Sequence, residues 1–441
     1  MKGLTLDAAA RRIVEIASGL GADETTARVS KGSWTELQRR DGKVEKAQES
    51  RSLSAGVSLL VDGRYSSHST SDLRPDALQG FLERAVAATR FLEPDENRHL
   101  PELSRMGAAD VDLDPIDPGQ ETRSPDDRRA AVEALEARAQ AHTSDLKTRS
   151  ITSFGWDGAS ESALVTSHGF DAHWASTSFG LGASVSLEDA GGKLPEAWTS
   201  YQARHNDDIP APETIAADLA ERGRGRLGSG PMESGRYPLL LDRRVVSGLL
   251  RALMGPLSGT AIFEGRSCLK DKLGERIGSE AFTLLDDPLI PRALGSHPHD
   301  GDGLPARRRV IVDEGVLQMF FLSVYNSRRL KVPGTTGGAS NLVIPPGDRS
   351  PTALAADRGR VIRVDGFLGG NSNASTGDFS FGIQGALLED GKPVRALSEM
   401  NISGDLFSLL ERYRAAADDT WTHGSWRTPS LLFDDIQFSG A

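Results

Sequence analysis

The chain contains a single cysteine, Cys268, among its 441 residues. One thiol excludes an intramolecular disulfide framework, and it also excludes zinc or iron–sulfur sites built from several cysteines. Because Cys268 lies in an apolar-spaced segment between Ser267 and Leu269, a small packed side chain is favoured over a reactive thiol. Such sparse use of cysteine indicates a reducing compartment.

Long apolar runs are also missing. No segment approaches the roughly 18 apolar residues that are needed to cross a bilayer. The first twenty residues lack the unbroken apolar stretch of a signal peptide, because Arg11, Arg12 and Glu15 interrupt it. They predict an amphipathic surface helix instead. We therefore expect a cytoplasmic protein with no membrane association.

Basic residues are fewer than acidic residues. The chain has 51 Lys and Arg residues against 62 Asp and Glu residues, which gives a formal net charge of -11. Proteins that bind nucleic acids use Lys and Arg to neutralise phosphates. The composition therefore predicts no direct contact with nucleic acid.

The first 210 residues alternate between helical patterns and strand clusters. The dipeptides Asp41-Gly42 and Asp62-Gly63 are typical of tight hairpins, since they supply positive φ angles. Helices are predicted at Pro75–Phe91 and Pro125–Ala141, joined by a surface loop at Glu93–Gly119. The predicted strands are Thr26–Lys31, Thr35–Arg39, Lys43–Ser50, Leu53–Val61 and Arg64–Thr70, followed by a second set within Lys147–His205.

This order of elements predicts an α+β fold rather than alternating βαβ units. The similar strand clusters in the two halves of the first 210 residues suggest a structural duplication, although no clear sequence repeat accompanies them. A helix at Pro212–Arg226 runs into the Gly-rich stretch Gly223–Pro231, which indicates a domain boundary. We predict an N-terminal α/β domain with antiparallel sheets at 1–228. A β-rich C-terminal domain at 229–441 should carry packed helices at 243–258 and 404–416.

Several short motifs match known binding or catalytic patterns only in part. The segment Gly223–Gly228 fits G-x-G-x-x-G, but it ends a helix instead of following a strand, so it predicts a linker. Ser267 and Lys270 match Ser-x-x-Lys, yet the Ser-Asp-Asn and Lys-Thr-Gly partner motifs do not occur. His297 and His299, beside Asp300 and Asp302, form either a metal-binding loop or an acidic, Gly-rich turn. Elemental analysis of the purified chain distinguishes these two interpretations of the histidine loop.

The segment from Arg236 to Ser267 reads as a short apolar strand followed by an amphipathic helix, closed by Leu257-x-Gly259. It resembles the TldD/PmbA family, also called modulator of DNA gyrase. Further segments match the same family in the same order: Thr166–Phe170, Gly265–Gly274, Thr335–Leu342, Asn373–Ser380, Ser398–Asp405 and Thr428–Leu431.

The resemblance implies that TldD-type members carry His-Glu-x-x-x-His on this helix, together with a C-terminal cysteine. Here Leu250, Arg251 and Gly255 occupy the motif positions, and no cysteine follows Cys268. The chain therefore resembles the TldE/PmbA type. Without a Lewis acid or a general-base Glu, these positions have nothing to activate water for amide hydrolysis.

The resemblance implies a non-catalytic subunit of a heteromeric zinc metallopeptidase that acts on unfolded or modified peptides. Zinc is expected in the TldD-type partner and no cofactor in this chain, which can form a homodimer when the partner is absent. The alternative is a stand-alone peptide-binding or regulatory protein that acts on gyrase or on a toxin–antitoxin peptide. The predicted substrate-binding residues lie in Gly-rich loops after strands, and they are Arg266, Ser267, Asp300, Asp302, Thr336 and Asn341.

Overall fold

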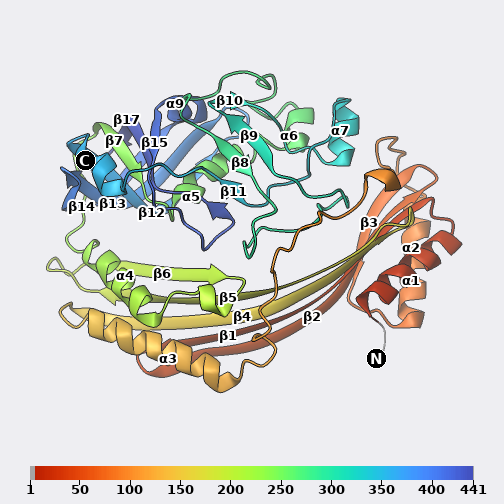
Figure 1. Cartoon of the computed structure of the whole chain (residues 1–441), viewed down its shortest axis with the longest axis horizontal. Coiled ribbons are helices and arrows are strands. Elements are labelled where there is room, and N and C mark those ends of the chain that lie inside the picture. The colour runs from red at the N-terminus through yellow and green to blue at the C-terminus, as the bar shows by residue number, and fades with distance from the viewer. Residues whose placement is uncertain (1–4, 441) are drawn as a thin grey trace.

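The structure is a computed structural model that describes residues 5–440, so Met1–Leu4 of the predicted N-terminal helix and Ala441 lie outside the described residues. Its first part is a long, curved antiparallel sheet (Figure 1) with the strand order β3-β2-β1-β4-β5-β6. The strands are β1 (Glu24–Arg40), β2 (Lys43–Val61), β3 (Arg64–Thr70), β4 (Thr148–Thr166), β5 (Asp171–Leu187) and β6 (Glu196–Ala203).

Both predicted hairpins are present. Asp41 and Asp62 have φ angles of 46° and 50°, and each is followed by a glycine with positive φ. The predicted interruptions inside β1 and β2 were wrong. Gly32 remains extended because it pairs with Ser52 on one side and Ser160 on the other, so ladder hydrogen bonds hold it where its local preference is weak.

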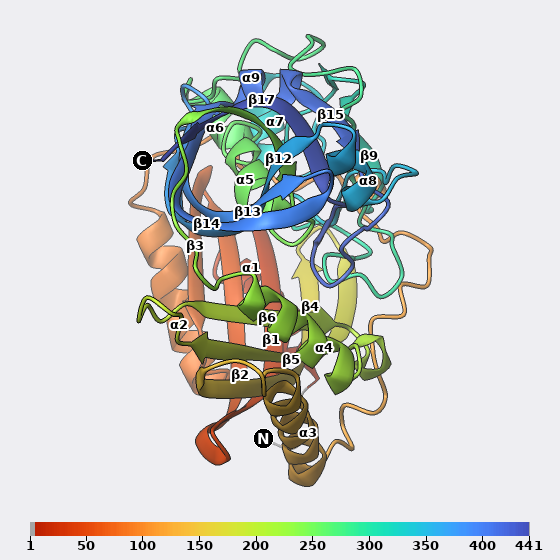
Figure 2. The same cartoon turned by 90° about the vertical axis from the view of Figure 1, so that its left-hand side faces the viewer.

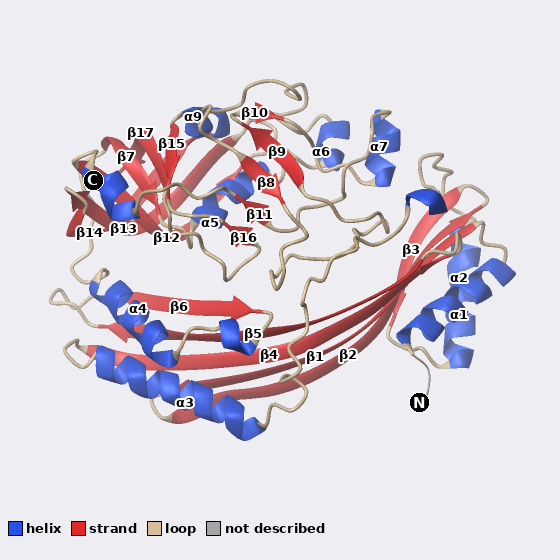
Figure 3. Cartoon of the chain, in the orientation of Figure 1, coloured by secondary structure: helices blue, strands red, loops and turns tan. Residues whose placement is uncertain are grey.

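Four helices cover the two ends of this sheet (Figure 3). α1 (Leu6–Gly19) and α2 (Pro75–Thr89) pack on one end, and α3 (Pro125–His142) and α4 (Pro212–Arg224) pack on the other. Each end has its own buried cluster, centred on Ile13 and Leu59 at the first and on Leu135 and Ile215 at the second. Both halves have the element order αβββα, and their strands β1 and β4 pair in the middle of the sheet. This is the arrangement that a structural duplication would produce.

The C-terminal part is built on two sheets. The larger has the order β14-β13-β12-β7-β17-β15, and an additional pairing of β14 with β17 closes it into a ring (Figure 2). Its strands are β7 (Gly235–Leu241), β12 (Arg360–Ser372), β13 (Asp378–Glu389), β14 (Lys392–Asp405), β15 (Tyr413–Ala416) and β17 (Leu431–Ser439). The smaller sheet contains β8 (Leu284–Asp286), β9 (Arg309–Asp313), β10 (Val316–Leu317), β11 (Leu342–Val343) and β16 (Trp426–Arg427).

The largest core of the molecule lies in this C-terminal part and includes fully buried Phe282, Phe433 and Phe438. Short helices pack around it, namely α5 (Val246–Leu250), α6 (Gly259–Phe263), α7 (Val324–Leu330), α8 (Pro351–Ala356) and α9 (Leu406–Glu411). The predicted α+β class, with antiparallel sheets and a β-rich C-terminal region, is confirmed. The predicted division near residue 228 stays a prediction.

Two predicted helices are much shorter than expected. The segment 243–258 forms α5, a 3-10 turn at Arg251–Leu253 and an irregular link to α6. Gly255 and Pro256 explain the interruption, because proline lacks an N–H donor and disfavours helical geometry in the residue before it. The segment 404–416 ends its helix at Glu411, and Tyr413 then pairs with Phe433 of β17. Tertiary strand pairing overrides the helical pattern there.

The two parts of the molecule are joined by buried polar contacts. Arg226, just after α4, forms an ion pair with Asp365 of β12 at 2.6 Å, and both side chains are largely buried. Farther along the interface, the Arg204 guanidinium donates to the backbone oxygen of Leu294 at 2.6 Å. Among the described residues, no helix is both long and apolar enough to traverse a lipid bilayer.

Candidate functional site

The three positions of the His-Glu-x-x-x-His motif lie at the end of α5 and in the segment that follows it. They are occupied by Leu250, Arg251 and Gly255. Leu250 is fully buried in the C-terminal core, whereas Arg251 and Gly255 are exposed. An aliphatic side chain, a guanidinium and a glycine supply no metal ligand, so these positions do not fit zinc. Within residues 5–440, no three His, Cys, Asp or Glu side chains are grouped in a way that could hold a metal ion.

Arg251 instead lines a pocket of ≈ 340 Å³ between β6 and the C-terminal part. We call this the arginine pocket. Its lining combines charged, aromatic and small polar side chains from four separate stretches of the chain. These residues are Gln202, Arg243, Arg244, Ser247, Arg251, Leu294, Trp421, Gly424, Ser425 and Trp426.

Arg244 is held rigidly in the wall of the arginine pocket. One terminal nitrogen, Nη1, donates to Asp218 Oδ2 and to Thr199 Oγ1, both at 2.7 Å, and Nη2 donates to the Tyr201 hydroxyl at 2.7 Å. The guanidinium also lies 4.5 Å from the centre of the Trp421 ring. These contacts tie β6 and α4 to the segment after β7 and fix the position of one positive charge.

Arg243 and Arg251 are less constrained. Arg243 donates to the backbone oxygen of Asp419 at 2.9 Å, and its Nε lies 3.8 Å from an Asp419 carboxylate oxygen. The Arg251 guanidinium has no hydrogen-bond or ion-pair partner within residues 5–440. Nearby, burial lowers the pKa of His423, and the charges of Arg244 and Arg243 lower it further. The positive charge of the pocket therefore resides on the arginines.

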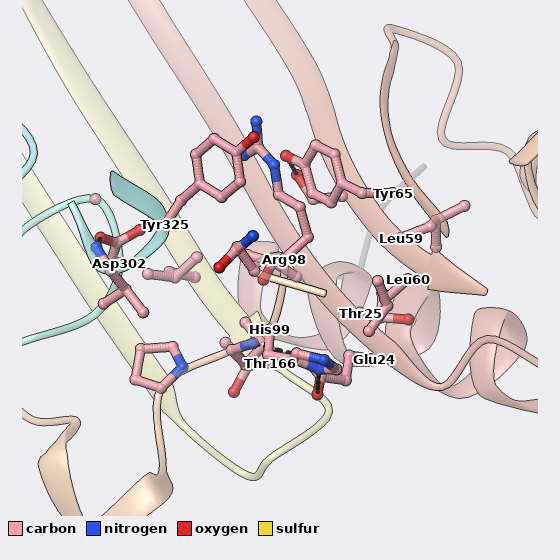
Figure 4. Close-up of a pocket in the computed structure, with 18 residues that line it drawn as sticks. Glu24, Thr25, Leu59, Leu60, Tyr65, Arg98, His99, Thr166, Asp302 and Tyr325 are labelled. Carbon is pink, nitrogen blue, oxygen red and sulfur yellow. Dashed lines mark hydrogen bonds and ion pairs between the residues drawn. The ribbon is translucent and has the colours of Figure 1, made fainter. Parts of the chain in front are cut away.

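A second pocket, of ≈ 260 Å³, lies at the other end of the interface (Figure 4). The Arg98 guanidinium is stacked between Tyr65 and Tyr325, at 4.3 and 3.3 Å from the ring centres, and the Tyr325 hydroxyl donates to Asp95 at 2.8 Å. Because its polar groups bind one another, this pocket is suited to holding the 93–101 loop in place. Asp302 also lines it, where burial raises the pKa of this carboxyl group.

The other predicted substrate-binding residues do not line either pocket. Ser267 is buried, donates to the Pro256 backbone oxygen at 2.7 Å and accepts from the Leu269 N–H at 3.0 Å. Lys270, its partner in the Ser-x-x-Lys pattern, is exposed. Arg266 lies on the surface and pairs with Glu264. These contacts give Ser267 a turn-stabilising role.

Asp300, Thr336 and Asn341 are buried. Asp300 Oδ1 accepts the N–H groups of Asp302 and Leu304, both at 3.0 Å, as expected for a carboxylate that shapes a tight turn. Nδ1–H of the buried His299 ring donates to the Asp300 backbone oxygen at 2.9 Å, and the ring packs edge-on against Phe170 with the ring centres 5.7 Å apart. The geometry of the 297–302 loop favours an acidic turn over a metal-binding loop. Peptide contact by any of the six predicted residues stays a prediction.

Asn341→Ala is expected to lower the free energy of unfolding by about 2 kcal/mol. The Asn341 side chain is fully buried and joins three loop groups: it accepts from the Gly295 N–H and donates to the Asp287 oxygen and the Ser296 hydroxyl. Calorimetric unfolding measures the change. The exposed Asn371→Ala on β12 is the control and should change stability by less than about 0.5 kcal/mol. Equal stability of the two variants would contradict a structural role for Asn341.

Most of the arginine pocket could not be predicted from the sequence. Two signals were visible in the sequence: the pair Arg243-Arg244, one residue after an apolar strand, and the aromatic stretch 421–426. The sequence does not show that these segments meet. Only the packing of the two parts of the molecule brings together Gln202, Arg244, Leu294 and Trp426.

Comparison with known proteins covers almost the whole chain. Family models described as PmbA/TldA metallopeptidase domain 1, central domain and C-terminal domain match residues 26–89, 118–227 and 234–440. A metalloprotease PmbA homolog from Haemophilus influenzae is 27% identical over 97% of this chain and 94% of its own length. The metalloprotease PmbA of Escherichia coli O157:H7 is 26% identical over 99% and 96% of the two chains.

Solved structures give the same result. A Bacteroides thetaiotaomicron protein, described as a modulator of DNA gyrase, is 33% identical and has a TM-score of 0.95 over 100% of both chains. TldE from Thermococcus kodakarensis has a TM-score of 0.86 at 21% identity, over 98% of this chain and 100% of its own. The three matching domains and the shared fold show that this chain belongs to the PmbA/TldD family of peptidase-like proteins.

Proposed function

We propose that this chain is the non-catalytic, TldE/PmbA-type subunit of a heteromeric zinc metallopeptidase that degrades or matures peptides. The observation that carries the proposal is the state of the motif positions: Leu250 is a core residue, and Arg251 and Gly255 offer neither a zinc ligand nor a general base. The relatives named metalloprotease PmbA and the structural neighbour named TldE support this assignment. Zinc and the hydrolytic step would then belong to a TldD-type partner.

A surface for such a partner, or for a peptide, is available on β2. Its residues 43–54 pair with β1 on one side, while β3 pairs only with the later part, from Ala55 onward. Within the described residues, the outer edge of 43–54 therefore presents unpaired backbone N–H and C=O groups. Edges of this kind bind extended segments by strand addition. Charged side chains along the edge, including Lys46, Glu49 and Arg51, are exposed and disfavour indiscriminate pairing.

Co-expression with a paralogue that carries His-Glu-x-x-x-His tests the proposal. We expect the two chains to elute together from a size-exclusion column, in a mixture that cleaves casein-derived peptides and loses this activity with a chelator. This chain alone should show no peptidase activity. The control is the same pair with the motif Glu of the paralogue replaced by Gln, which should form the complex but cleave nothing.

Separate elution, together with no activity in the mixture, would overturn the assignment. The chain would then be a stand-alone peptide-binding or regulatory protein. Sedimentation of the chain without its partner tests whether it forms a homodimer in the same preparation.

A further inference from the structure

We propose that the arginine pocket binds a peptide carboxylate, either the C-terminal α-carboxylate or an acidic side chain. The inference rests on the proposed function for the identity of the ligand as a peptide. It assigns a binding role to the place where a catalytic motif would stand. The chain would hold one end of the substrate while its partner cleaves elsewhere.

The positive charge of the pocket favours an anionic ligand. Three of its ten lining residues are arginines, and none of the described lining residues is acidic, in a chain with a net charge of -11. Asp218 compensates Arg244, and Asp419 lies beside Arg243. Arg251 is exposed and has no partner within residues 5–440. An anion that reached Arg251 would therefore displace no internal salt bridge.

Guanidinium chemistry favours a carboxylate. Arginine presents its N–H donors in a planar fork that matches the two oxygens of a carboxylate, and these charge-assisted bonds are about twice as strong as neutral ones. Arg244, in the same pocket as Arg251, is already fixed by Asp218, Thr199 and Tyr201, so this wall of the pocket is preorganised. Hydroxyl and amide groups of Ser247, Ser425 and Gln202 also line the pocket and can bind the remaining oxygen lone pairs.

The remaining walls fit the neighbouring part of a peptide. Trp421, Trp426 and Leu294 offer apolar surface beside the arginines. A pocket of ≈ 340 Å³ is within the size range of small-ligand sites, which combine apolar walls with a few convergent polar groups. A nucleic acid would require an extended positive face, and the acidic balance of the chain opposes that.

Titration calorimetry with three N-acetylated hexapeptides tests the proposal on the whole chain. The first peptide ends in Leu with a free carboxylate and has no acidic side chain. The second is its C-terminal amide, and the third is the amide with one internal Glu. Binding of the first alone assigns the α-carboxylate, whereas binding of the third as well assigns any accessible carboxylate. Equal binding of the second peptide, or binding of none, overturns the proposal.

Arg251→Gln is the decisive variant, because Arg251 is exposed and its loss should leave the fold intact. We expect it to weaken binding of the first peptide by about tenfold or more. Arg12→Gln removes the same charge from α1, at the other end of the sheet (Figure 1), and should leave binding unchanged. Circular dichroism of both variants confirms folding, and unchanged affinity in Arg251→Gln contradicts the proposal.

The two proposals fail separately. Complex formation with a TldD-type paralogue is measured without added peptide, and peptide binding is measured without the paralogue. A chain that binds carboxylate peptides but elutes apart from the paralogue refutes only the subunit assignment. A chain that forms the active complex but does not distinguish acid from amide refutes only the role of the pocket.

Discussion

Replacing Leu250 by histidine is expected to destabilise the protein by about 4 kcal/mol instead of restoring a metal site. Leu250 is 0% exposed and packs in the C-terminal core with Leu249 and Leu253. The substitution removes buried methyl groups, leaves part of their volume empty and places imidazole nitrogens among apolar neighbours. The other motif positions supply no ligand that could offset this cost.

Calorimetric or fluorescence-monitored thermal unfolding measures the effect as a lowered midpoint. Leu250→Met preserves volume and apolar character, so it should cost less than about 1.5 kcal/mol. Arg251→Glu, at an exposed position, should change stability by about 0.5 kcal/mol or less. A Leu250→His variant as stable as Leu250→Met would show that this position tolerates a polar side chain, and it would contradict the expected destabilisation.

Local chemistry explains the elements that the sequence predicted well. Asp41-Gly42 and Asp62-Gly63 adopt positive φ and make both hairpins. Ser124 and Asp127 form a reciprocal capping box at the start of α3, with Pro125 in its first turn. These signals act within a few residues, so they can be read without knowing what the segment packs against.

Apart from the helix at 243–258, which the local Gly255 and Pro256 interrupt, the errors lie where distant segments decide the outcome. Tyr413 leaves its predicted helix because β17 offers it a strand partner, and Gly32 stays in β1 because strands flank it on both sides. The arginine pocket is the same case at the level of the site. Arg251 was identified from the sequence only as a missing glutamate, since its neighbours Gln202 and Trp426 are remote in the chain.

Arg226, whose buried ion pair joins the two parts of the molecule, is the site of the second large effect on stability. Arg226→Gln is expected to lower the free energy of unfolding by about 3 kcal/mol. The side chains of Arg226 and Asp365 are 8% and 11% exposed, so the substitution leaves a carboxylate largely shielded from water. Arg363 still lies 3.3 Å from Asp365 and limits the loss. Thermal unfolding of the purified variant measures the change.

Arg224→Gln provides the matched control, because Arg224 lies two residues away and pairs with Asp145 on the surface, where both side chains are about half exposed. Exposed pairs of this kind contribute about 1 kcal/mol or less. The double variant Arg226→Gln with Asp365→Asn removes both charges, so it should regain part of the stability that Arg226→Gln loses. If the double variant is less stable than Arg226→Gln by the full cost of Asp365→Asn measured alone, the two residues act independently. The ion pair would then contribute nothing to holding the two parts of the molecule together.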